Sequence, residues 1–164
     1  MADDYRSRID FIKYVSSNLS DQIKMADTKA AWTFSALGVA AAALTNKLIK
    51  TDWSSIPKTQ GMLFLGIAII LFVASFKELV GVIFPRLSKG NTSGTTYFKD
   101  ILTQSPQSYT QKIEKYTDKE ITAALSSQAH TLSTIADKKY KLLRLAMISS
   151  LLTIIWTIFL LVVL

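Results

Sequence analysis

Apolar residues gather in three blocks along this chain, separated by polar segments. Residues 145–164 contain no charged side chain, and residues 62–84 are apolar except for Lys77, Glu78 and a few small polar positions. Residues 30–49 are less apolar and richer in small side chains. A helix needs roughly 20 apolar residues to cross a ~30 Å hydrocarbon core. The three blocks therefore predict an all-α membrane protein with three transmembrane helices.

The first and last blocks continue long polar helices, with no Gly or Pro at either junction. Apolar residues recur at three- and four-residue steps through residues 1–29, which predicts an amphipathic helix. A capping box of Thr117 and Glu120 predicts that the final helix begins near Asp118 and runs to Leu164. Its polar half carries a coiled-coil seam with two polar members. The seam consists of Ile121, Leu125, Gln128, Leu132, Ile135, Lys139 and Leu142.

The distribution of basic residues predicts the orientation of the chain. Lys and Arg concentrate near residues 1–29 and in residues 85–144, whereas fewer flank the loop at residues 50–61. Because cytoplasmic segments are enriched in Lys and Arg, we expect both basic segments to be cytoplasmic. The loop and the C-terminus are then outside. Within residues 85–144, a short helix is predicted to be capped by Ser105, with Pro106 at its first position.

The composition excludes several classes of site. The chain has a net charge of +7, no Cys and a single His. Disulfides and thiolate metal sites are therefore excluded, and one histidine cannot hold a metal alone. No phosphate-binding Gly-rich loop, G-x-S-x-G or H-E-x-x-H motif occurs. We expect no enzyme, no metal and no cofactor.

Charged and small residues at the predicted membrane helices are candidates for a pore or an interface. Asp27 and Lys29 at the start of the first helix are solvated interfacial charges, a charged ring at a pore mouth, or partners for Lys139 or Arg144. Lys77 and Glu78 in the second helix are boundary residues or pathway residues. Small residues at three- and four-residue steps indicate either ordinary packing within a bundle or the inner ring of an oligomer. They are Ala31, Ser35, Gly38 and Ala42.

The cytoplasmic residues include the ingredients of a small nucleotide site. Aromatic rings stack on bases and basic side chains hold phosphate. The alternative is structural, because aromatic residues at helical spacing usually form a core and polar seam residues often fix register. Lys139 can also snorkel to solvent. The candidate ligand residues are Tyr97, Phe98, Gln128, His130, Lys139 and Arg144.

Three stretches of the chain resemble a known family. They are "IKMADTKAAWTFSALGVAAA", "TYFKDILTQSPQSYTQKI" and "SQAHTLSTIADKKYKLLRLA". Together they resemble, in the family's order, the transmembrane effectors of Pycsar, the bacterial pyrimidine cyclase system for antiphage resistance. In place of the Gly usual in that family after the central aromatic pair, this chain has Lys99. The family motifs correspond to Asp27, Lys29, Ala30, Tyr97, Phe98, Ser105, Pro106, Tyr109, Gln128, Ser133, Lys139, Tyr140 and Arg144.

The resemblance implies an antiviral function in the inner membrane of a bacterium, with the C-terminus periplasmic. Such effectors respond to a cyclic pyrimidine mononucleotide, cyclic CMP (cCMP) or cyclic UMP (cUMP), made by a partner cyclase. They then impair the membrane, and the infected cell stops growing or dies. The resemblance also favours a ligand role for Gln128 and Lys139. We also expect membrane lipid as a partner. We expect no polymeric nucleic acid as a partner.

Two further considerations bear on the mechanism. Shifting an equilibrium from about 1% to 99% open needs ~5.5 kcal/mol of differential binding, more than one small ligand supplies. We therefore expect a homo-oligomer with several ligand sites. Two other functions stay open on the sequence: a holin-like pore former that needs no ligand, and a membrane-anchored adaptor that recruits a partner through its coiled-coil seam.

Overall fold

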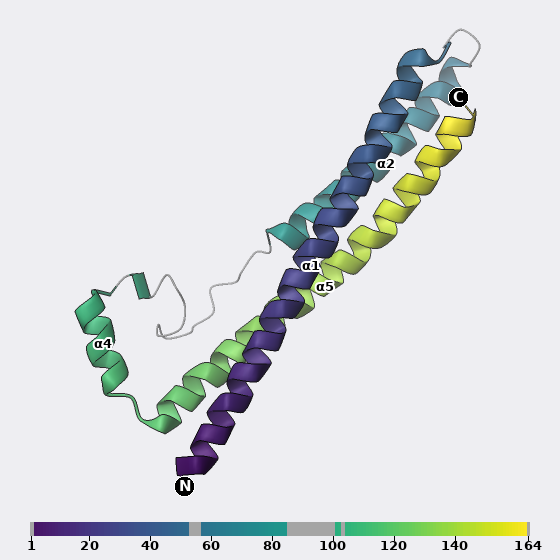
Figure 1. Ribbon diagram of the computed structural model, residues 1–164. Coiled ribbons are helices and arrows are strands. Elements are labelled where there is room, and N and C mark those ends of the chain that lie inside the picture. Colours follow the sequence, from purple (N-terminus) through teal and green to yellow (C-terminus); the bar gives the residue numbers. More distant parts are fainter. Residues whose placement is uncertain (1, 53–56, 85–100, 103, 164) are drawn as a thin grey trace. The chain divides into compact units, whose positions relative to one another are not determined.

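The protein is built from helices. The computed structural model describes residues 2–52, 57–84, 101–102 and 104–163, and every regular element in these ranges is helical. The all-α prediction is therefore confirmed. No Pro interrupts the three long helices, although two of them contain Gly. The helices are α1 (Ala2–Lys50), α2 (Lys58–Ile83), α4 (Pro106–Glu114) and α5 (Asp118–Val163) (Figure 1).

The chain divides into two compact units, and α1 and α5 contribute to both. The first unit contains Met1–Lys24 and Leu87–Asp137, and the second contains Met25–Arg86 and Lys138–Leu164. The first unit therefore holds the polar parts of α1 and α5 together with α4. The second holds α2 and the apolar parts of α1 and α5.

Side-chain caps set where α4 and α5 begin. The backbone N–H of Ser108 donates to Ser105 Oγ at 3.2 Å, with Pro106 in the first turn of α4. At α5, the Thr117 backbone N–H donates to Glu120 Oε2 at 2.8 Å, and the Glu120 N–H reaches Thr117 Oγ1 at 3.4 Å. Both predicted caps are confirmed. Such caps satisfy backbone N–H groups that have no partner within the helix.

The Glu120 cap is expected to respond to pH. Hydrogen bonds from the backbone and then the side chain of Thr117 lower the pKa of the exposed Glu120 carboxyl below its usual value. The cap therefore stabilises the start of α5 above the usual pKa, and this contribution is lost as pH falls through the lowered pKa. Amide exchange of Thr117, corrected for its intrinsic rate, should accelerate over that range. The Glu120→Gln variant should show no such transition, and an identical transition in both proteins would contradict the assignment.

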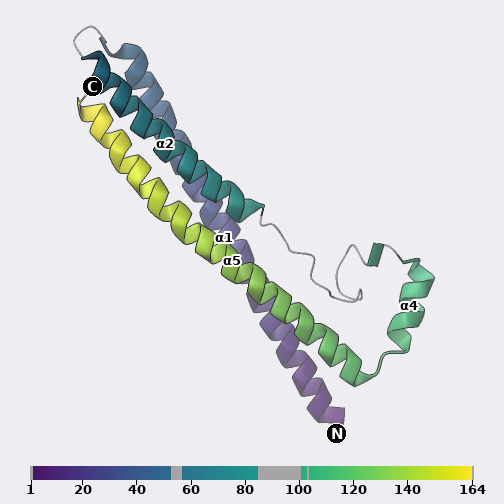
Figure 2. The same ribbon diagram turned by 180° about the vertical axis from the view of Figure 1, so that it is seen from behind.

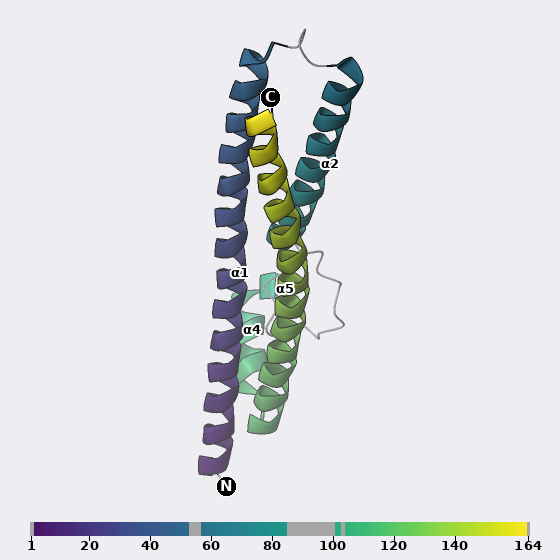
Figure 3. The ribbon, with the colours of Figure 1, turned by 90° about the vertical axis from the view of Figure 1, so that its right-hand side faces the viewer.

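In the second unit, three helices run side by side. Helices α1 and α5 point in the same direction, and α2 runs antiparallel to them (Figures 1 and 2). The view turned by 90° in Figure 3 shows the same relative directions of the three helices. Buried apolar residues from all three helices form the core. One cluster contains Ala26, Ala30, Leu37, Leu79, Val82, Leu143 and Ala146, and a second contains Leu44, Ala68 and Leu160.

The buried face of α5 in this unit keeps coiled-coil spacing. Its steps alternate between four and three residues, as a heptad seam requires. The predicted seam placed Leu142 on this face, whereas the structure buries Leu143 and leaves Leu142 half-buried at the edge of the core. The buried positions are Lys139, Leu143, Ala146, Ser150, Thr153, Thr157 and Leu160.

Among the residues that the structure describes, two helices are long and apolar enough to cross a membrane. These are the Thr59–Ile83 part of α2 and a stretch within Asp118–Val163 of α5. The predicted first span, residues 30–49 of α1, is not among them. It nevertheless packs along the other two, because Leu37 and Leu44 lie in the two core clusters. The fold is therefore all-α with two candidate membrane spans.

Candidate functional site

A partly buried ion pair links α1 to α5 where their apolar parts begin. Lys139 Nζ donates a hydrogen bond to Asp27 Oδ1 and forms a salt bridge with it. The Lys139 side chain is only 6% exposed, whereas the Asp27 side chain is 44% exposed. The pair therefore has one end inside the bundle and one end that water reaches.

The pairing decides between alternatives that the sequence left open. Asp27 is a partner of Lys139, as one of the three predicted alternatives held. The snorkelling alternative for Lys139 is wrong, because the side chain is buried on the α5 seam. Ala26 and Ala30, both fully buried, give α1 a small-residue face near this level. Small side chains let helix backbones approach closely, so the ammonium finds a carboxylate across the interface instead of water.

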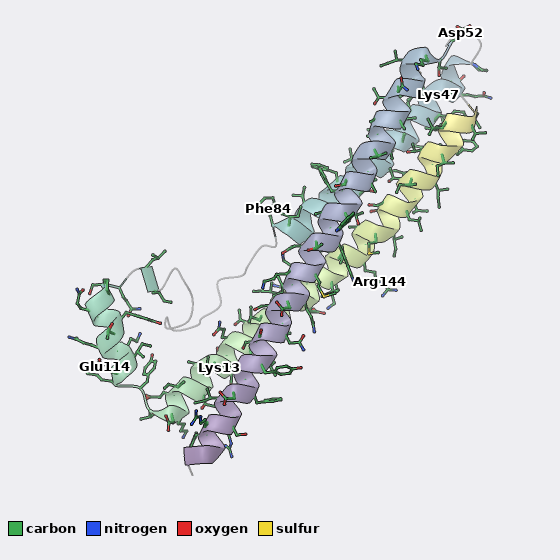
Figure 4. All side chains as sticks on the ribbon, in the orientation of Figure 1. Lys13, Lys47, Asp52, Phe84, Glu114 and Arg144 are labelled. Atoms are coloured by element: carbon green, nitrogen blue, oxygen red, sulfur yellow. The ribbon has the colours of Figure 1, made fainter. Side chains whose placement is uncertain are left out.

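Lys29 and Arg144 lie on a different surface from Lys139. Arg144 follows Lys139 by five positions on α5, which places the two side chains about 140° apart around the helix. Arg144 is exposed and projects from α5 (Figure 4). It lines, together with Lys29, an open groove of about 340 Å³ between α1 and α5. Tyr140, Leu143, Met147 and Ile148 complete the lining.

Hydroxyl groups occupy the interior of the bundle beyond the ion pair. Ser75 Oγ of α2 and Thr153 Oγ1 of α5 share a hydrogen bond of 2.9 Å, and both residues are buried. Thr157 Oγ1 donates to the Thr153 carbonyl at 2.9 Å. The buried Ser150 hydroxyl has no hydrogen-bond partner within the part of the chain that the structure describes. We call Ser75, Ser150, Thr153 and Thr157 the hydroxyl seam.

The outer face of α5 is apolar, in contrast to the hydroxyl groups on its buried face. Large apolar side chains are exposed there, between and around the buried hydroxyls. A helix that is polar inside and apolar outside is suited to a lipid environment, where the surrounding solvent is hydrocarbon. The exposed set includes Leu145, Met147, Ile148, Leu151, Leu152, Ile155, Ile158 and Phe159.

The Ser75–Thr153 hydrogen bond is expected to contribute modestly to stability. Interhelical hydrogen bonds in membrane proteins average about 0.6 kcal/mol in double-mutant cycles. We expect a coupling free energy of about that size between Ser75→Ala and Thr153→Val. Unfolding of the single and double variants in mixed micelles measures it. Additive effects of the two substitutions would show that the hydroxyls do not stabilise one another.

The small-residue stripe predicted on α1 faces outward in the single chain. Ala31, Ser35, Gly38 and Ala42 are all exposed. Ordinary packing within the bundle, one of the two predicted alternatives, is therefore wrong for these positions. A Cβ placed on Gly38 would meet no atom within 4 Å.

An apolar groove lies beside this stripe. It has a volume of about 430 Å³ and is lined by residues of α1 and α2, including Gly38 and the exposed Lys77. The rings of Phe34 and Phe76 line it as well, with centroids 5.7 Å apart. The groove and the stripe together form an open surface of small and apolar residues, and small residues are what membrane helices use where they pack closely against one another.

The remaining predicted site residues lie elsewhere. Glu78 is half-buried on α2. Gln128 is half-buried and His130 exposed, and both belong to the first unit. Tyr97 and Phe98 lie outside the described residues. Sequence reasoning did not single out the hydroxyl seam. Within the described ranges, no group of three or more His, Cys, Asp or Glu side chains could hold a metal ion.

Comparison with known proteins identifies the family. A protein-family model described as "Pycsar effector protein domain" matches residues 11–164, nearly the whole chain. The chain belongs to the Pycsar effector family. No curated protein and no solved structure matched it. The resemblance seen in the sequence is thereby confirmed.

Membership of this family implies three properties of this Pycsar effector. It is an effector of antiphage defence, and its family consists of transmembrane effectors and is not known as a family of enzymes. Its two apolar helices agree with a membrane protein. The Pycsar system works through a cyclic nucleotide made by a cyclase, so this effector acts in a pathway with that product.

Proposed function

We propose that this effector senses a cyclic pyrimidine mononucleotide, cCMP or cUMP, and then disrupts the inner membrane of the infected cell. The observation that carries the proposal is the family match over residues 11–164. Growth arrest or death of the infected cell then follows from loss of the membrane barrier.

Three helices of the second unit are proposed to cross the membrane. Residues 30–49 lie along both candidate spans, with Leu37 and Leu44 in the shared core. The directions of α1, α2 and α5 are those of a chain that crosses three times (Figure 1). Because cytoplasmic segments are enriched in Lys and Arg, the basic segments support a cytoplasmic N-terminus. The C-terminus is then periplasmic.

The Asp27–Lys139 pair is the proposed trigger. A cyclic mononucleotide carries one negative charge on its phosphate, and that anion competes with the Asp27 carboxylate for the Lys139 ammonium. Because Asp27 is the exposed member of the pair, displacement begins on its side. Base recognition is proposed for Gln128, His130 and the aromatic pair Tyr97 and Phe98, and each is tested separately by substitution.

Transfer of the Lys139 ammonium from Asp27 to the phosphate is proposed to draw Lys139 out of the interior and so let the helices of the second unit separate. The hydroxyl seam then becomes accessible to water, and its polar groups stabilise hydration of the interior. Ligand sites in several copies are needed to supply ~5.5 kcal/mol for a complete shift. A homo-oligomer is therefore proposed, with the stripe at Ser35 and Gly38 as its contact surface. The open groove beside Gly38 supports this assignment.

Calorimetric titration of the detergent-purified protein tests the ligand. Binding of cCMP or cUMP is expected, with cyclic AMP and cyclic GMP as controls for the base. Lys139→Ala should weaken binding at least tenfold and abolish the response while leaving membrane insertion intact. Lys138→Ala is the matched control, because Lys138 is an exposed neighbour with the same charge. Absence of binding by every cyclic nucleotide to a correctly folded protein would contradict the proposal.

A further inference from the structure

The groove that contains Lys29 and Arg144 combines charge with an apolar wall. Both side chains are exposed, and within the described residues neither has a carboxylate at ion-pair distance. Leu143, Met147 and Ile148 lie on the same groove. Its volume of about 340 Å³ is open to the outside of the bundle. Two exposed cations beside an apolar wall make the groove amphipathic.

The groove lies at the level where a membrane surface is expected. Lys29 directly precedes the apolar part of α1, and Arg144 is the last charged residue before the uncharged stretch of α5. Trp32, one turn beyond Lys29, is 75% exposed. Exposed Trp side chains prefer the boundary between headgroups and hydrocarbon. This position is independent of the groove itself and indicates the same depth.

We propose that this groove binds the headgroup of an anionic phospholipid of the cytoplasmic leaflet. Lys29 and Arg144 hold the phosphate, Arg144 through its planar fork of donors. Met147 and Ile148 lie against the first part of an acyl chain. Basic pockets between membrane helices on the cytoplasmic side bind anionic headgroups by the same chemistry. The proposal rests on the membrane location proposed above and is independent of any nucleotide.

The site gives Arg144 a role different from the one predicted from the sequence. Arg144 and Lys139 do not share a surface, so a single phosphate does not bridge them in this arrangement. A lipid at Lys29 and Arg144 spans α1 and α5 next to the Asp27–Lys139 pair. The bound lipid therefore holds the two helices together at the level of the proposed trigger.

Native mass spectrometry of the full chain tests the lipid site without nucleotide. The protein in detergent micelles is mixed with equal amounts of phosphatidylglycerol and phosphatidylcholine, and the complexes are then released from the micelles in the mass spectrometer. We expect retention of phosphatidylglycerol but not phosphatidylcholine. The variant Lys29→Gln/Arg144→Gln should bind phosphatidylglycerol at least tenfold more weakly. The conservative Lys29→Arg/Arg144→Lys variant should keep most of the binding and shows that the fold survives changes here.

A matched variant distinguishes binding in the groove from a general effect of the protein's positive charge. Lys13→Gln/Lys138→Gln removes the same charge from two exposed positions outside the groove, and it should bind phosphatidylglycerol like the unchanged protein. Equal loss in both double variants would overturn the site, as would equal retention of the two lipids. Displacement of phosphatidylglycerol by millimolar inorganic phosphate would also overturn it, because the groove would then be a site for free phosphate.

Discussion

Asp27→Asn is expected to make liposomes leak without any nucleotide. The substitution leaves the buried Lys139 ammonium without a carboxylate. Breaking a buried ion pair costs about 3–5 kcal/mol. Because the Asp27 side chain is 44% exposed, we expect about 2 kcal/mol, roughly a 30-fold shift toward the open state. Dye release from liposomes that contain the purified variant measures this shift.

The opposite substitution should have the opposite effect. Lys139→Met keeps the unbranched shape and most of the length of the side chain and removes the buried charge, and the half-exposed Asp27 carboxylate is left to water. This variant should stay closed and ignore the nucleotide. Combining both substitutions should restore the closed state lost in Asp27→Asn. An Asp27→Asn protein that remains tight while Lys139→Met leaks would show that the pair does not hold the bundle closed.

Gly38→Leu is expected to prevent assembly of the oligomer and to abolish nucleotide-induced release. Apart from the adjoining residues and turns of α1 itself, no atom of the chain lies within 4 Å of a Cβ at this position, so the fold of the single chain should accept the larger side chain. A neighbouring copy packed on the stripe would be pushed away. Light scattering after size-exclusion chromatography in detergent measures the mass of the assembly.

Gly66→Leu is the matched control for this substitution. Gly66 lies on α2, and a Cβ there also meets no atom of the chain within 4 Å. The same change at this position should leave the assembly and the response intact, because Gly66 is not on the α1 stripe. Equal assembly of Gly38→Leu and the unchanged protein would exclude the stripe as the contact surface.

The helices of this protein could be predicted because their signals are local. The capping box at Thr117 and Glu120 and the Ser105–Pro106 start depend on residues within one turn. The continuity of α1 and α5 depends on the absence of Gly and Pro at the junctions, which is equally visible. The possible pairing of Asp27 with Lys139 could be named as well, because both stand where an apolar block begins.

The inside and outside of the second unit could not be predicted in the same way. In the final block almost every position is apolar, so the contrast that marks a buried face in a water-soluble helix is missing. The buried positions are instead marked by hydroxyls such as Ser150 and Thr153. Adjacent leucines at 142 and 143 fit the seam equally well by type, and only the packing distinguishes them.

The small residues of α1 show a related difficulty. A stripe of small side chains indicates close packing but not the identity of the neighbour. The chain buries Ala26, Ala30 and Leu37 and leaves Ser35 and Gly38 exposed. The neighbour of such a stripe is set by contacts between helices, which the spacing of residues in one helix does not encode. The groove at Lys29 and Arg144 could not be predicted either, because residues of both α1 and α5 line it and it forms only where these helices pack together.

Release of dye from liposomes that contain the purified effector, against a panel of cyclic mononucleotides and dinucleotides, tests the central claim most directly. Release with cCMP or cUMP alone is the expected result, and it would name the ligand. Release with nothing added would favour a holin-like pore and contradict gating by a nucleotide. No release with any nucleotide, with insertion verified by protease protection, would favour an adaptor and contradict membrane disruption.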